Sequence, residues 1–494
     1  MLVPANLEIA LRYLRQAQKG YHQVFWIGAI STNQQDLSEC KHEVSMRSLI
    51  FKNARKVMAW LGPANETSDI AMKFLEKFET IPDTPESVKK GLLSMSEVTW
   101  AAIQNLLRRS WFYQLWIIRQ VTLAKEVDVF CGNRTISWSI FERIEAAYTE
   151  YGPEIQQYTF KLHVRRLASW ERRTETFPER SFTRTILGSD GLTTFVAIRR
   201  RWKEGRPYSM LEALAMIHSW GALDICEKLH SLLPLVDDDI QRKIVVDYTS
   251  PTWQVYSRFA CYWLEYSRDL DLLSYSNKIR PNQGSRWVPN WGRYTRTSSL
   301  DPGYGSRPFA NQSQRLYNAT LGSSTSLEFV FDGKFELLRL SGIRIGYLEH
   351  LGCSLSRSTS PIIDQLIEWK RLMDAPRVIE RSKQELRNDV FIRTILADQD
   401  FDMFAGSKRL KPRMKEIQDD EIHQALQGYS WALQYSLEDR TFMVTDKGYV
   451  GLCPEHAEVG DEVFLLYGGR MPYILRSQDP AGQQSGKYEL IGEA

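Results

Sequence analysis

The first 150 residues alternate between apolar segments of strand-like and helix-like spacing. Apolar side chains recur near helical spacing over 5–18, which predicts a short amphipathic helix. Uninterrupted apolar runs over 24–30 and 56–62 predict two buried strands, with a helix between them over 36–55. A further helical pattern follows the second strand. This strand–helix–strand–helix order predicts a parallel α/β sheet flanked by helices.

Helix-capping residues and chain-breaking residues predict the remaining helices and strands of this region. Ser68 is expected to be the N-cap of a helix over 69–78, and the polar segment 84–91 is expected to be a loop. Two further helices, a strand and a capped helix are predicted over 99–109, 110–126, 127–132 and 137–148.

The pattern changes several times after residue 150. Irregular helical segments give way to a Gly/Ser/Pro/Asn-rich connection anchored by Trp287 and Trp291, then to strand signals, then to a charged helical region. Short alternating segments with Gly punctuation close the chain and predict a small antiparallel sheet or barrel. These changes suggest an N-terminal domain, a helical middle region, a mixed β/helical region and a β-rich module, over 1–150, 151–295, 296–438 and 439–494.

The composition is that of a soluble globular protein, with 43% hydrophobic and 25% charged residues. Lys plus Arg (63) nearly balances Asp plus Glu (60), so charge offers no argument for nucleic acid. No run of about 18 apolar residues predicts a membrane span. Six scattered cysteines predict free thiols, and eight histidines form no metal-binding motif. We expect a cytoplasmic protein with no metal site.

A polar segment directly after the first predicted strand is a candidate pocket. Ser31, Thr32, Asn33 and Gln34 would lie at the carboxyl end of a parallel strand, before a helix N-terminus that suits a phosphate or ribose. The competing interpretation is that Asn33 and Gln34 cap and brace the turn. No GxGxxG or P-loop motif accompanies them.

Three motif blocks resemble the fungal heterokaryon incompatibility (HET) domain family. They read NLEIALRYLR…FWIGAISTNQQDLSECKHEV, LIFKNARKVMAWLG and RRSWFYQLWIIRQVTLAKEVDVFCG. SRWVPNW and GYVGLCPEHAEVGDEVFLLYGG resemble later parts of long HET proteins, so the similarity spans nearly the whole chain. The family-motif positions with a structural role are Trp26, Trp60, Leu61, Gly62 and Trp116.

The resemblance implies a HET domain with a TIR-like parallel sheet flanked by helices. It also implies a role in fungal non-self recognition and programmed cell death, with other incompatibility proteins as partners. Family members usually begin with one more strand and continue past the last residue here. The resemblance therefore suggests a chain shortened at both ends, with the first strand of the domain missing.

Two departures from the family pattern bear on activity. Gly28 stands where the family usually has Asp, and Gln120 stands where it usually has Glu. Some TIR domains hydrolyse NAD with a glutamate, because a carboxylate stabilises the oxocarbenium character of the transition state. Gln120 can hydrogen-bond a ribose hydroxyl and joins the candidate pocket, but it supplies no charge.

We therefore expect a protein that acts by interaction or signalling with a degenerate pocket, and not an enzyme. The alternative is an NAD-consuming glycohydrolase that uses a displaced carboxylate from Asp36, Glu39 or Glu43, so NAD or a related nucleotide is the ligand to consider. Those three are otherwise expected to be solvated charges on the following helix. No catalytic residue is assigned.

Two further residue sets have ordinary structural explanations. The aromatic side chains of the first region, at Trp26, Trp60, Trp111 and Trp116, are expected to pack in the core and not to stack on a base. The Arg/aromatic tracts over 164–184 and 197–206 are expected to be solvated helical faces and not an RNA surface. The chain therefore predicts no nucleic-acid partner.

Overall fold

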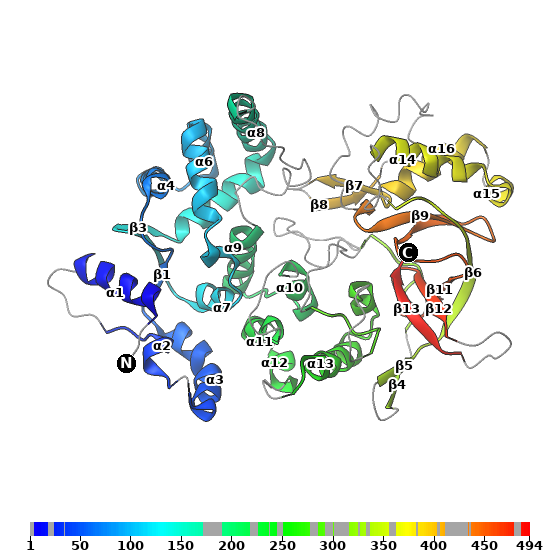
Figure 1. Cartoon of the computed structure of the whole chain (residues 1–494), viewed down its shortest axis with the longest axis horizontal. Coiled ribbons are helices and arrows are strands. Elements are labelled where there is room, and N and C mark those ends of the chain that lie inside the picture. The colour runs from blue at the N-terminus through cyan, green and yellow to red at the C-terminus, as the bar shows by residue number, and fades with distance from the viewer. Residues whose placement is uncertain are drawn as a thin grey trace. The chain divides into compact units, whose positions relative to one another are not determined.

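A computed structural model describes most of the 494-residue chain (Figure 1). The described residues are 4–17, 24–33, 35–170, 190–217, 226–236, 238–244, 250–276, 285–291, 300, 316–324, 327–331, 336–354, 362–381, 384–402, 406–410, 433, 436–478 and 486–494. They form two compact units. The first comprises 1–210, 220–222 and 229–243, and the second comprises 211–219, 223–228 and 244–494.

The first unit contains a small mixed sheet. β1 (Val57–Trp60) pairs in parallel with β2 (Val127–Cys131), and β2 pairs antiparallel with β3 (Arg134–Ser137). The strands predicted at 56–62 and 127–132 are confirmed, whereas β3 was not predicted. The helices of this unit include α1 Ala5–Ala17, α2 Gly28–Ser31, α3 Leu37–Asn53, α4 Glu66–Glu76, α5 Pro85–Leu93, α6 Glu97–Leu107, α7 Trp116–Leu123, α8 Ser139–Trp170 and α9 Asp190–Lys203.

The strand predicted over 24–30 is wrong. The segment ends in the single turn of α2, where the amides of Ile30 and Ser31 both donate to the carbonyl of Ile27 (2.9 and 2.8 Å). Val24 is fully exposed. A buried strand needs a neighbouring strand to pair its backbone groups, and here a local turn pairs the amides of Ile30 and Ser31 instead.

Helix α4 begins one turn earlier than predicted. The Asn65 side chain accepts a hydrogen bond from the amide of Ser68 (2.7 Å), and Ser68 Oγ accepts one from the amide of Asn65 (2.8 Å). This reciprocal pair is a capping box. Asn65 is therefore the N-cap, and Ser68 is the third helical residue.

The loop predicted over 84–91 is also wrong, because this segment forms α5. The Thr84 side chain caps its first turn and Pro85 occupies its first position, which is a favoured place for proline. Val88 and Leu92 are almost completely buried. The polar composition of this segment suggested a loop, although the sequence contained the signals for a helix start.

Aromatic rings form the centre of the first unit. The contacting rings have centroids 5.0 to 6.3 Å apart, mostly edge to face, which is a favourable geometry. They come from the turn before α7, from the start of α8 and from α9, at Trp111, Phe112, Trp138, Phe141 and Phe195. This cluster joins the 3-10 turn before α7 to α8 and α9, which follow the sheet in the chain.

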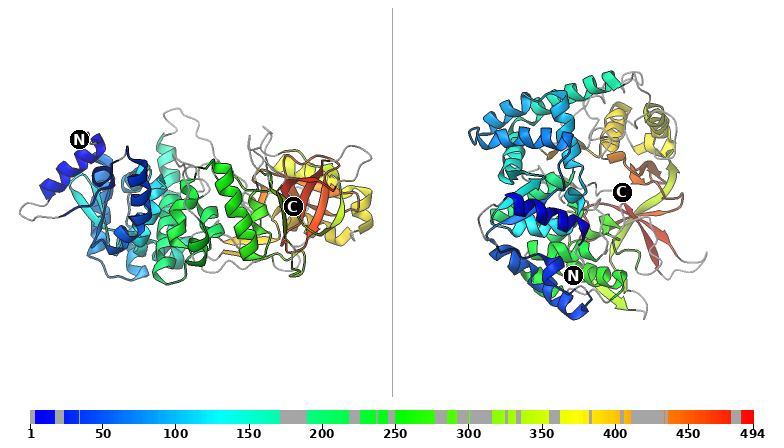
Figure 2. Two further views of the ribbon diagram at one scale, coloured as in Figure 1. Left: turned by 90° about the horizontal axis from the view of Figure 1, so that it is seen from below. Right: turned by 60° about the vertical axis from the view of Figure 1, so that its left-hand side comes forward.

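The second unit is built around a curved antiparallel sheet (Figure 1; Figure 2). Its strand order is β10-β9-β6-β11-β12-β13, and all of its pairs are antiparallel. The two end strands approach each other, since a Cβ on Gly492 would lie 2.7 Å from Pro454 Cγ. The strands are β6 Gly342–Leu351, β9 Arg440–Thr445, β10 Val450–Pro454, β11 Glu462–Leu466, β12 Tyr473–Ser477 and β13 Tyr488–Glu493. The predicted small antiparallel sheet is confirmed, with β6 added to it.

Three helices cover the β9 side of this sheet: α14 Ile362–Arg371, α15 Pro376–Arg381 and α16 Gln384–Ile395. Their contact includes Trp369 and Phe391 against Phe442, with centroids 6.1 and 5.7 Å apart. The unit also contains α13 Thr252–Ser267 and two hairpins, β4–β5 (Glu328–Phe331, Glu336–Arg339) and β7–β8 (Gln399–Asp402, Gly406–Arg409). Of the two anchoring tryptophans predicted, Trp291 is buried against Tyr256 and Phe259.

None of the described helices is both long and apolar enough to cross a bilayer.

Candidate functional site

The polar turn after α2 is held by its own hydrogen bonds. The amide of Gln35 donates to Asn33 Oδ1 (3.1 Å), and the amide of Asn33 donates to Glu39 Oε1 (3.0 Å). Asp36 Oδ1 accepts from the amide of Glu39 (3.1 Å), which caps the start of α3. The turn-bracing interpretation is therefore confirmed for Asn33. Thr32 is buried.

The other predicted pocket residues divide between two places. Ser31 is exposed at the end of α2, and Gln34 lies outside the described residues. Gln120 is half-buried on α7, which packs against α3. Within the described part of the chain, no hydrogen bond joins Gln120 to the turn. The common pocket of residues 31–34 and Gln120 stays a prediction.

A buried carboxylate lies directly beside Gly28. A Cβ on Gly28 would be 3.3 Å from Glu43 Oε1 and 3.3 Å from Cη2 of Trp26. The Glu43 side chain is only 8% exposed. The expectation that Glu43 is a solvated surface charge is wrong, because α3 turns this position towards α2.

Arg47 neutralises this carboxylate from one helical turn further on. Its Nε lies 2.8 Å from both Glu43 oxygens, and its Nη2 lies 2.7 Å from Oε2. The Arg47 side chain is 28% exposed, so the pair is open to solvent on one side. The i,i+4 spacing of the two residues was a visible signal for this pair, whereas the burial of Glu43 had none.

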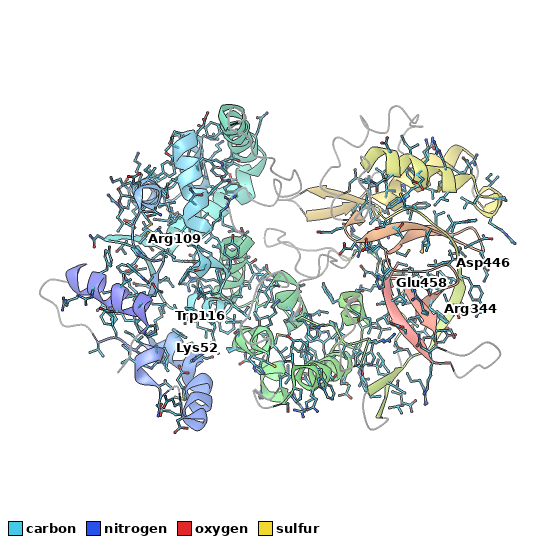
Figure 3. The ribbon with its side chains drawn as sticks, in the orientation of Figure 1. Lys52, Arg109, Trp116, Arg344, Asp446 and Glu458 are labelled. Carbon is cyan, nitrogen blue, oxygen red and sulfur yellow. The ribbon has the colours of Figure 1, made fainter. Side chains whose placement is uncertain are left out.

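Two of the four tryptophans predicted for the core are partly exposed. Trp26 is 39% and Trp116 is 37% exposed, so that prediction is wrong for them. Trp111 is buried, and half-buried Trp60 contacts the ring of Tyr13 at 5.2 Å. Figure 3 labels Trp116 of α7 and Lys52 of α3, two helices that pack against each other.

Trp26 and Trp116 are not the only exposed apolar side chains among the described residues of this region. The helix predicted over 110–126 is broken by a 3-10 turn, Ser110–Tyr113, so that α7 begins at Trp116. Further exposed apolar side chains lie on α3 and on the segment before α2, at Met46, Leu49, Val24 and Phe25. Exposed apolar side chains that gather into one patch are typical of an interaction surface.

The carboxyl edge of the parallel strand pair is closed by an arginine. Arg109 Nη1 donates to the carbonyl of Leu61 (2.8 Å), and Nη2 donates to the carbonyl of Pro63 (3.0 Å). Gly62 has φ +108°, and a Cβ there would lie 3.2 Å from Arg109 Nη1. The family-motif residues Leu61 and Gly62 therefore form a turn that Arg109 holds. No local pattern in the sequence predicts this contact.

The Arg-rich tract over 197–206 is not a solvated face at its first two arginines. Arg199 is 2% exposed and its Nε lies 2.9 Å from Glu142 Oε1, while Arg200 pairs with buried Glu145. These guanidinium groups are engaged inside the unit and do not form an RNA surface. The tract over 164–184 lies outside the described side chains.

The described residues contain no group of three or more His, Cys, Asp and Glu side chains that could hold a metal ion. Of the cysteines that are described, Cys131 and Cys453 are buried free thiols.

Two segments of the chain match known protein families. Residues 1–120 match the family described as heterokaryon incompatibility protein (HET), and residues 377–494 match the Het-6 beta-barrel domain. The chain is also similar to "Heterokaryon incompatibility protein 6, OR allele" of Neurospora crassa, with 23% identity over 589 aligned positions. That alignment covers 99% of this chain and 83% of the relative. No solved structure matches the chain.

Each matched segment covers part of one of the two structural centres described above. The first covers α1 to most of α7, with the turn after α2 and the buried Glu43, and the second covers β9 to β13. The order of the modules and the similarity along the whole chain agree with the motif blocks in the sequence. The chain thus carries a HET domain followed by a Het-6 beta-barrel domain.

Proposed function

We propose that this chain acts in fungal heterokaryon incompatibility, in the non-self recognition that leads to programmed cell death. The HET and Het-6 barrel matches and the similarity to heterokaryon incompatibility protein 6 support this role. In this proposal 1–150 is the effector domain, and 151–295, 296–438 and 439–494 form the parts that control it. The protein would act in the cytoplasm, with other incompatibility proteins as partners.

The proposal of a non-catalytic mechanism rests on the acidic side chains near Gly28, which are already engaged in hydrogen bonds or an ion pair. Asp36 and Glu39 accept hydrogen bonds from backbone amides, and Glu43 is bound by the Arg47 guanidinium. A carboxylate engaged in this way offers less charge to a developing oxocarbenium ion. The neutral Gln120 offers none.

The exposed apolar side chains supply what an interaction mechanism needs. Trp26, Met46, Leu49 and Trp116 belong to elements that contact one another, since α3 packs against α7 and Trp26 packs on Phe51 of α3 at 5.8 Å. Aromatic side chains contribute strongly at protein interfaces. We therefore assign the effector surface to the exposed face of α3, α7 and the segment before α2.

One observation favours the alternative, a TIR-like NAD glycohydrolase. Glu43 places a shielded carboxylate in the space that a side chain on Gly28 would enter, so it is the displaced carboxylate that this mechanism requires. The parallel pairing of β1 and β2 is compatible with a TIR-like sheet. The residues fit NAD only in part, because Ser31 and Gln120 can hydrogen-bond a ribose but Arg47 must first release Glu43.

Nicotinamide release from NAD by the purified chain separates the two mechanisms. We expect no release above the uncatalysed background. Release that disappears in Glu43→Gln but persists in the matched variant Glu39→Gln would replace our mechanism with the hydrolase. Thermal unfolding of both variants shows whether a lost signal reflects a lost fold.

Expression in fungal cells, with viability as the readout, tests the assigned surface. Trp116→Ser should abolish the loss of viability caused by the chain, whereas Glu43→Gln should retain it. Val98→Ser is the matched control, because Val98 is an exposed apolar residue on α6, outside this surface. Equal effects of the two serine variants would contradict the assignment.

A further inference from the structure

Helix α7 has an unusual C-terminal closure. In any α-helix the last four carbonyls lack donors within the helix, and α7 has only eight residues. The Arg199 guanidinium supplies donors from another helix: Nη1 donates to the carbonyls of Val121 and Ala124, the latter at 2.7 Å, and Nη2 donates to the carbonyl of Lys125 at 3.2 Å. A single side chain therefore closes the end of α7.

Arg199 is itself held in place. It lies on α9 and is 2% exposed, and its Nε donates to Glu142 Oε1 of α8 at 2.9 Å. Lys203 reaches the same Glu142 oxygen at 3.2 Å. Burial lowers the pKa of Arg199, and the ion pair with Glu142 opposes that shift. The planar, multi-donor guanidinium suits this arrangement, whereas the single ammonium of a lysine would not reach all the acceptors.

The helix that Arg199 closes carries part of the proposed effector surface. Trp116 and Gln120 lie on α7, and α7 packs against α3, which carries Glu43. The family match ends at residue 120, within α7, whereas the residue that closes this helix lies on α9. The position of the effector surface thus depends on a segment beyond the matched domain.

We propose that Arg199 is a positioning residue through which α8 and α9 set the orientation of α7 and thereby of the effector surface. This inference rests on the proposed function for the identity of that surface. It gives the helical region a physical route of control, because a partner that moved α9 would remove the donors from the end of α7. Arg199 would then respond to events outside the HET match without touching any ligand of the site.

Hydrogen exchange of the intact chain, measured by mass spectrometry, tests the positioning role directly. In Arg199→Met, amides of α7 should exchange about tenfold faster, with a smaller increase in α3, while α4 and α5 stay within about twofold of the parent. Arg199→Lys should give an intermediate result for α7. Uniform acceleration throughout the unit, or no change in α7, would overturn the proposal.

Arg201→Met is the matched control on the same helix. Arg201 stacks on the ring of Tyr208 at 4.1 Å and donates to the carbonyl of Arg206, away from α7. It should leave exchange in α7 unchanged. If Arg199→Met fails to fold, Glu142→Gln keeps the arginine and removes its counter-ion. Acceleration confined to α7 in that variant supports the proposal, and its absence contradicts it.

Measuring viability together with hydrogen exchange distinguishes a failure of this inference from a failure of the proposed function. Arg199→Met should both loosen α7 and reduce the loss of viability. Faster exchange in α7 with undiminished killing would leave the positioning role intact and refute the assignment of the effector surface to α7.

Discussion

Arginine has different partners in the two units of the protein. In the first unit, Arg109, Arg143 and Arg199 each donate to two or more backbone carbonyls from distant segments. In the second unit, Arg440 and Arg476 bind carboxylates that lie on or between the strands. The three arginines named from the first unit thus each bridge several carbonyls, although Arg134 there also pairs with Asp69 and Glu76. Arg476 of the second unit binds carboxylates with most of its donors and reaches a single carbonyl, that of His456.

Secondary structure explains the difference. Short helices and connections leave carbonyls without donors, and the first unit contains many of both. An antiparallel sheet pairs its own backbone groups, so arginines of the second unit are available for carboxylates. Arg344 follows this rule on β6, where it contacts Glu462 of β11 at 3.1 Å and lies over the ring of Tyr347. Figure 3 shows Arg344 on the same unit as Asp446 and Glu458.

The largest loss of unfolding free energy should come from breaking the buried ion pair between Arg440 and Glu493. Arg440 and Glu493 are 1% and 3% exposed and lie 2.8 Å apart, joining β9 to β13. Arg440→Met leaves Glu493 charged and buried, so we expect the second unit to lose about 3–5 kcal/mol of unfolding free energy. Urea unfolding measures this loss. Arg339→Met, which breaks an exposed pair with Glu328, should cost less than about 1 kcal/mol. Similar losses in both variants would contradict the argument from burial.

Breaking an arginine–carbonyl contact of the first unit should cost less. Arg109→Met removes the donors to the carbonyls of Leu61 and Pro63, with an expected loss of about 1–3 kcal/mol, because water can reach the partly exposed turn. The exposed neighbour provides a control, and Arg108→Met should change the unfolding free energy by less than about 0.5 kcal/mol. Faster hydrogen exchange confined to β1 and β2 would locate the effect. A loss as large as that of Arg440→Met would erase the contrast between the units.

The smallest expected effect on the unfolding free energy concerns Lys228, a buried cation of the second unit. Burial lowers the pKa of Lys228 to about 8 from 10.5. Between pH 8 and 10.5 the unfolded chain therefore holds more protons than the folded one, and the contribution of Lys228 to stability rises with pH. Lys228→Met should raise the unfolding free energy at pH 7 by about 1–2 kcal/mol and lose this gain towards pH 10.5. A difference between parent and variant that does not change with pH would show that Lys228 is not buried as a cation.

The local residue pattern predicted those helices and strands whose formation does not depend on a distant contact. The apolar runs that became β1 and β2 and the helical spacing of α1 were read correctly, because period and burial agree there. The missed helix α5 also had local signals, with Thr84 and Pro85 at its start. Its composition alone was misleading.

The sequence-based predictions were wrong where a contact with another part of the chain determines the structure. The run over 24–30 has the composition of a strand, but no described strand pairs with it and a turn forms instead. Glu43 has the spacing of a surface helix charge, yet the packing of α3 against Gly28 buries it. In both cases the deciding contact comes from outside the local pattern. The pocket predicted from residues 31–34 and Gln120 depends on such contacts as well.

The amino-acid sequence by itself determined the family, the order of its modules, most helices and strands, and the absence of a carboxylate at positions 28 and 120. Only the tertiary structure decided that Glu43 lies beside Gly28, that Arg109 closes the turn after β1 and that Arg199 closes α7. The physical reason is that spacing along the chain encodes which face of an element is apolar. It does not encode which charged side chain, dozens of residues away, reaches the unpaired carbonyls and carboxylates that the fold leaves inside.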